Sequence, residues 1–166
     1  MLTRFLHRAD EEEGFTLIEL MVVVLIIGIL IAIALPTFLG ARQRAQNRAA
    51  QSSLRNTLVA AKTSYTDTSD YSGATTTGLQ AIEPSLTYLA AGVASTGPNA
   101  VSVAVTNAAS GGTNNRFSAA ALSQSNTCYW IMDDASSGGT GTKYGTGPVA
   151  TCNGTTAVGA NLTAFP

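Results

Sequence analysis

One uninterrupted apolar run limits what this chain can fold into more than any other feature. Leu20 to Leu35 reads LMVVVLIIGILIAIAL, sixteen residues without a polar side chain. Together with Phe15 to Glu19 it would reach about 31 Å as an α-helix, which matches the roughly 30 Å hydrocarbon core of a bilayer. The segment is therefore expected to be a secretory signal peptide, a membrane anchor, or an apolar helix with a further role.

The first two alternatives each leave a feature unexplained. Ala32 to Ala34 fits the A-x-A cleavage site of a signal peptide, but the preceding region carries the acidic run Asp10 to Glu13 against only two arginines. A plain single-span anchor does not explain Glu19. A lone carboxylate in a span costs about 2.5–3.5 kcal/mol at the centre and less near an end.

Residues 14–19, GFTLIE, abut the apolar run and resemble the type IV pilin signature. In that family a prepilin is cut after a glycine, the mature chain begins with Phe, and Glu is its fifth residue. The resemblance implies leader cleavage between Gly14 and Phe15, N-methylation of Phe15, and an assembly role for Phe15 and Glu19. The carboxylate of an incoming subunit would pair with the amine of a subunit already placed. Since the two groups lie one helical turn apart, pairing within one chain stays open.

Gly28 and Pro36 fall where the family has helix-weakening residues. Pro36 has no amide hydrogen and crowds the carbonyl of Ala32, and Gly28 lowers helix propensity by about 1 kcal/mol relative to Ala. The resemblance implies that the helix between them can loosen in an assembled filament. Tolerated kinks in a membrane helix are the alternative.

The composition argues against catalysis. Charged residues make up 11% of the chain, against about 25% in soluble proteins. The only histidine, His7, lies in the leader that processing would remove, so histidine-dependent catalysis and histidine metal sites are excluded in the processed chain. The net charge of −1 does not indicate the excess of basic residues that is typical of nucleic-acid-binding proteins. We expect no enzymatic activity, no cofactor and no metal site.

The remaining sequence predicts one long helix followed by a sheet. We expect a leader at 1–14, a transmembrane and assembly helix at 15–40, an amphipathic helix half at 41–66, an αβ loop at 67–98 and a β-sheet head at 99–166. Leu54, Leu58, Ala61 and Tyr65 form the apolar stripe of the amphipathic half, in which every charged residue is basic.

Alternating and turn residues place the smaller elements. A short helix is predicted near Gly78 to Glu83, and strands at Ala100 to Thr106, Arg116 to Leu122, Cys128 to Met132 and near Lys143 to Ala150. The predicted fold class is α+β: a long N-terminal α-helix with a membrane-spanning first half, packed by its second half on a small antiparallel β-sheet head. The resemblance implies the same layout.

Cys128 and Cys152 are the only cysteines. Their position resembles the disulfide-bounded C-terminal region of many type IV pilins, which implies a bond between them; two buried unpaired thiols are the alternative. Between them lie Asp133 and Asp134. We expect these two carboxylates to form a solvated turn rather than a calcium site.

The predicted function is the structural subunit of a type IV pilus-like extracellular filament. Its expected partners are other copies of itself, a prepilin peptidase, the pilus assembly machinery, and the lipid bilayer before assembly. The precursor would cross the cytoplasmic membrane once, with a cytoplasmic leader and an exported head. One alternative is a pseudopilin of a type II secretion or DNA-uptake system, and another is a surface protein without a filament role.

Overall fold

The computed structural model describes residues 14–107, 113–147 and 149–157. Of the predicted leader, only Gly14 lies among the described residues. The chain divides into two compact units, Met1–Gly40 and Ala41–Pro166. Helix α1 (Leu17–Thr68) contributes to both units and has Pro36 inside it. The predicted long helix is therefore present, ending two residues later than expected.

The head has a five-stranded sheet with the strand order β1-β2-β3-β4-β5. The strands are β1 (Thr87–Leu89), β2 (Ala100–Thr106), β3 (Arg116–Leu122), β4 (Cys128–Asp134) and β5 (Gly141–Gly147). Three short helices complete it: α2 (Thr76–Ile82), η1 (Val149–Thr151) and α3 (Gly154–Ala157). The α+β prediction is confirmed, and β2 and β3 have the predicted bounds.

The sheet is not wholly antiparallel, which corrects one prediction. Strands β2 to β5 pair antiparallel, but β1 pairs parallel to β2, with Thr87 opposite Ala100. Strand β1 comes from the stretch expected to be a loop. A strand of three residues is too short to show the period-two alternation that indicates a strand in the sequence. The sequence therefore did not predict β1 or its parallel pairing.

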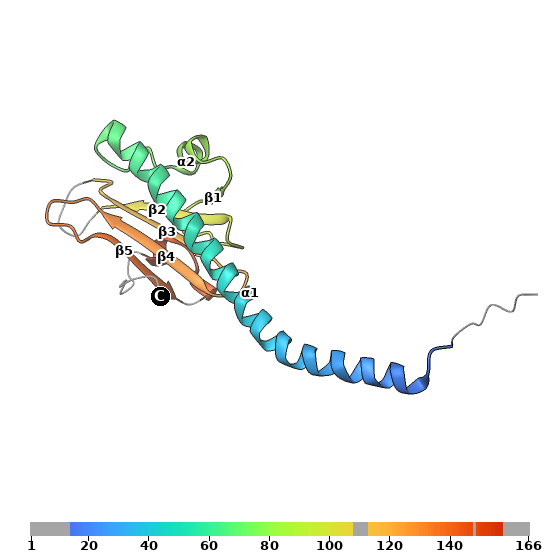
Figure 1. Ribbon diagram of the computed structural model, residues 1–166. Helices are drawn as coiled ribbons and strands as arrows, with labels where there is room; N and C mark the ends of the chain where they lie inside the picture. Colours follow the sequence, from blue (N-terminus) through green and yellow to red (C-terminus); the bar gives the residue numbers. More distant parts are fainter. Residues whose placement is uncertain (1–13, 108–112, 148, 158–166) are drawn as a thin grey trace, which may run out of the picture. The chain divides into compact units, whose positions relative to one another are not determined.

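Every residue of strand β4 is buried. Because consecutive side chains of a strand point to opposite faces of the sheet, β4 contributes to a core on each face. Tyr129 and Ile131 belong to the larger core, called the front core here, which lies where the second half of α1 packs against the sheet (Figure 1). The predicted stripe residues Leu54, Leu58 and Ala61 are buried in that core, and Tyr65 is partly buried against it. On the opposite face, the back core consists of Ala120, Cys128, Trp130, Met132, Cys152 and Ala157. The sheet thus lies between α1 and the C-terminal segment.

Candidate functional site

Helix α1 begins with a reciprocal cap formed by Thr16 and Glu19. The Thr16 hydroxyl accepts a hydrogen bond from the Glu19 backbone N–H at 3.2 Å. Glu19 Oε2 accepts from the Thr16 backbone N–H at 2.9 Å and from its hydroxyl at 2.6 Å. This is a capping box, which satisfies two N–H groups that the helix itself cannot pair. Sequence reasoning missed this role, although the T-x-x-E spacing before an apolar run is its signature.

The structure brings Phe15 and Glu19 to one face of the segment. They line a shallow surface hollow together with Ile18, Val22 and Val23, and Phe15 is 81% exposed. All three bonds of the cap leave Glu19 Oε1 unused. The carboxylate can therefore cap its own helix and still accept from a further donor.

Within the described part of the chain, packing requires neither Gly14 nor Gly28. A Cβ added at either position would meet no atom within 4 Å. Helix α1 runs through Gly28 and Pro36 without interruption, and the Thr37 hydroxyl donates to the Ala34 carbonyl at 2.8 Å in the turn around the proline. Loosening of this helix in an assembled filament stays a prediction.

The apolar segment is uncovered along its whole length. Every residue from 14 to 39 is exposed, and an 18-residue window of α1 has a mean hydropathy of 3.1. By length and composition, this helix can cross a membrane. Uncovered apolar surface of this extent is typical of a membrane or protein interaction site.

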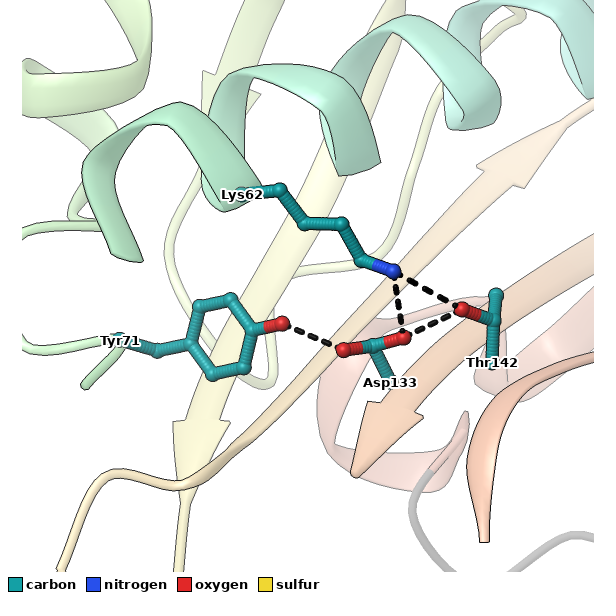
Figure 2. A network of polar contacts seen from close by, with 4 residues as sticks. All are labelled: Lys62, Tyr71, Asp133 and Thr142. Atoms are coloured by element: carbon teal, nitrogen blue, oxygen red, sulfur yellow. Dashed lines mark hydrogen bonds and ion pairs between the residues drawn. The ribbon is translucent and has the colours of Figure 1, made fainter. Parts of the chain in front are cut away.

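In the head, Asp133 is the centre of a buried polar network (Figure 2). Its Oδ1 lies 3.0 Å from Lys62 Nζ and accepts from the Thr142 hydroxyl, while Oδ2 accepts from the Tyr71 hydroxyl. Lys62 also donates to the Thr142 hydroxyl at 3.2 Å. The network joins α1 to strands β4 and β5 and to the segment that follows the helix.

The network shifts the pKa of both acidic groups in it. Burial alone would raise the pKa of Asp133, but hydrogen bonds from Thr142, Tyr71 and Lys62 outweigh burial and lower it. Burial, followed by the hydrogen bond to Asp133, raises the pKa of the Tyr71 phenol far above its usual value. Asp133 is therefore held as a carboxylate and Tyr71 as a neutral donor.

The predicted solvated turn at Asp133 and Asp134 is wrong. Strand β4 continues through both residues, which are 5% and 7% exposed. Alternation directs them to opposite faces of the sheet, and Asp134 pairs with Arg116 at 2.8 Å. Each carboxylate therefore has its own cation, and the two cannot share an ion. No group of three His, Cys, Asp or Glu residues among the described residues can hold a metal ion.

Cys128 and Cys152 form a disulfide with a Cα–Cα distance of 5.6 Å. Both are fully buried, so the bond ties the C-terminal segment to β4 inside the back core. Two residues later, Gly154 approaches β2 so closely that an added Cβ would lie 2.8 Å from backbone atoms of Val103 and Ala104. The Gly154 carbonyl accepts from the Ser118 hydroxyl at 2.8 Å. The disulfide and these contacts hold the segment across the sheet.

Comparison with known proteins also points to the N-terminal segment. Residues 11–35 match the family model described as the prokaryotic N-terminal methylation motif. The chain is 46% identical over 59 residues to the type IV major pilin protein PilA of Myxococcus xanthus (strain DK1622). That alignment covers 36% of this chain and 27% of the relative, so the chain spans just over a quarter of that protein's length.

No solved structure matches the chain. The α+β architecture, a long helix whose second half packs on a mostly antiparallel sheet, is consistent with a pilin fold. The motif, the similarity and the fold together support a type IV pilin.

Proposed function

We propose that this chain is the structural subunit of a type IV pilus-like extracellular filament. It is made as a prepilin, cut after Gly14, methylated on Phe15 and polymerised through the helix at 15–40. The observation that carries the proposal is the GFTLIE segment at the start of an apolar helical segment in which every residue from 14 to 39 is exposed. Such a helix is satisfied by lipid before assembly and by the helices of neighbouring subunits afterwards.

Cleavage creates a cation that can pair with Glu19. The new ammonium on Phe15 is a cation close to the apolar segment, where an unpaired charge is costly and a paired one much less so. Glu19 Oε1 is available to receive this amine from a neighbouring subunit. The pair would then penalise any axial offset that leaves either charge without a partner.

The membrane orientation follows from the same proposal. The leader stays in the cytoplasm, the helix crosses the membrane once, and the head is exported before the subunit enters the pilus. A disulfide between Cys128 and Cys152 supports export, because such bonds persist in oxidising compartments. The expected partners are a prepilin peptidase, the assembly machinery and further copies of the chain.

A structural rather than enzymatic role is proposed, since type IV pilins are structural proteins. The similarity to a major pilin favours a pilus subunit over a pseudopilin. Both alternatives share the processed N-terminal segment, so processing alone does not separate them. The presence of the chain in extended surface filaments would distinguish a pilus subunit from a pseudopilin.

The test is the mass and N-terminus of the subunit recovered from sheared filaments. We expect a chain that starts at N-methylated Phe15. Gly14→Val provides the matched variant. A Cβ at that position meets no atom of the described residues within 4 Å, so the protein should insert normally yet remain uncut and absent from filaments. A mature start at Leu35, or an intact Met1 in filaments, would contradict the proposal.

A further inference from the structure

The charges on the head half of α1 are segregated along its axis. From residue 41 to 62 every charged side chain is basic, and the first acidic residue that follows is Asp67, with Asp70 just beyond the helix. At 1.5 Å per residue, Arg44 and Asp67 are separated by about 35 Å along this part of the helix. This half of α1 is therefore basic at its start, and its exit carries two acidic residues.

Contacts within the chain account for only some of these charges. Lys62 pairs with Asp133, Arg55 interacts within the chain, and the Asp70 carboxylate accepts hydrogen bonds from Thr68 and Ser72. In the described part of the chain, however, neither the basic end (Arg42, Arg44 and Arg48) nor Asp67 has an ion pair or a charged hydrogen-bond partner. All four side chains are exposed.

The helix dipole does not explain the acidic end either. Asp67 lies in the last turn of α1, where unpaired carbonyl groups make the helix terminus negative. A carboxylate is disfavoured there, and a basic side chain would be favoured. The position of Asp67 is thus mildly unfavourable for the isolated head, which points to a partner outside it.

The basic end also offers a place for a carboxylate. Arg44 and Arg48 are four residues apart on one face of α1. With Asn47, Gln51 and Tyr129 they line a shallow hollow of about 190 Å³. Two guanidinium groups and two amides make it rich in hydrogen-bond donors, which suits a carboxylate.

We propose that the basic end of one head contacts the acidic end, Asp67 and Asp70, of a second copy of this chain. The two surfaces differ, so the contact is heterologous. Repeating it builds an open helical assembly when the rotation between subunits does not close into a ring. The opposite charges at the two ends make them complementary. This inference rests on the proposed filament function and adds a head-to-head contact that sets the axial register of the subunits.

Charge reversal tests the contact. Asp67→Arg alone, and Arg44→Glu with Arg48→Glu, should each reduce the filament share of the protein by roughly tenfold, because like charges then face each other. Combining all three substitutions should restore most of that share. Lys143→Glu, a charge reversal on β5, is the matched control and should assemble as the wild type does. Equal membrane pools and an intact disulfide would show that the variants insert and fold.

Cross-linking tests the same contact with cysteine substitutions, which remove a charge but do not reverse it. Asp67→Cys is combined in turn with Arg42→Cys, Arg44→Cys and Arg48→Cys, and intact filaments are oxidised. A disulfide needs Cα atoms closer than about 7 Å, so a bond within one chain is impossible at the roughly 28–38 Å that separate these pairs along the helix. A ladder of covalent oligomers is expected for at least one pair and for none of the single-cysteine variants.

The outcomes separate the two proposals. Wild-type filaments with no ladder from any pair, or no rescue by the triple reversal, would overturn the head-to-head contact alone. Loss of filaments from the arginine reversals but not from Asp67→Arg would also overturn it and would point to anionic lipid headgroups as the partner of the basic end. Absence of the wild-type chain from any filament would overturn the proposed function, and this inference with it.

Discussion

Glu19 combines two roles that an apolar substitution would remove together. Its carboxylate closes the capping box with Thr16, and it is the acidic group proposed to pair with the Phe15 amine of a neighbour. A glutamine at the same position of a capping box still accepts from the cap residue's N–H. Glutamine therefore preserves the helix start while removing the charge.

Glu19→Val and Glu19→Gln should both insert and be cut after Gly14, and both should be poorly incorporated into filaments. The expected defect is similar in the two variants, because the lost charge is the cause and not the lost cap. Immunoblots that compare the membrane pool with the sheared-filament pool measure it. Wild-type amounts of Glu19→Gln protein in filaments, with Glu19→Val excluded, would assign the role to capping and not to a charge pair.

At the scale of elements, the Asp133 network decides how the second half of α1 is held on the sheet. Apolar packing in the front core is not directional, whereas three donors on one buried carboxylate specify the register of helix against strand. Tyr71 is fully buried and contributes a charge-assisted hydrogen bond, while the Lys62 side chain is 49% exposed. Their contributions to stability should differ accordingly.

Tyr71→Phe should lower the free energy of unfolding by about 1.5–3 kcal/mol, since it removes a buried hydrogen bond to a charged group. Lys62→Met should cost only about 0–1 kcal/mol, because solvent screens that pair. The fluorescence of Trp130, the only tryptophan, reports unfolding in denaturant. Tyr65→Phe, next to Tyr71 in the same aromatic contact, is the control and should change little. A larger loss from Lys62→Met than from Tyr71→Phe would contradict this ranking.

The same network predicts a stability window in pH. The pKa of Asp133 is lowered on folding, so its contribution is present above the unfolded value of about 3.9 and is lost as pH falls further. The pKa of Tyr71 is raised, so its contribution is lost as pH rises above about 10. Tyr71→Phe should therefore remove part of the alkaline destabilisation, which unfolding curves across pH would show.

At the scale of the whole head, the sheet depends on a cover at each face. Helix α1 supplies one cover, and the C-terminal segment held by Cys128–Cys152 supplies the other. The disulfide closes a loop with a sequence separation of 24. Losing it frees the segment in the unfolded chain and weakens the back core around Trp130.

The double variant Cys128→Ala, Cys152→Ala should be less stable by about 3.5 kcal/mol on the chain-entropy estimate. We expect normal cleavage after Gly14, because the processing site lies in the other unit, but a lower filament yield. Denaturant titration of the solubilised protein, with and without reductant, measures the loss. Wild-type stability that is unchanged by complete reduction would refute the role given to the disulfide.

The amino-acid sequence by itself determined the features that depend on neighbouring residues. The apolar run, the GFTLIE segment and the period-two alternation of Ala100 to Thr106 are local patterns, and each was predicted with nearly correct bounds. The assignment of Cys128 to Cys152 followed from family resemblance together with there being only two cysteines.

Only the tertiary structure decided what depends on residues distant in the chain. The parallel pairing of β1 and the burial of Asp133 and Asp134 on opposite faces were not predicted. A pair of adjacent carboxylates reads as solvated, since burying a charge is costly without a partner. Their partners, Lys62 and Arg116, lie far away in sequence and become neighbours only when α1 and β3 pack beside β4.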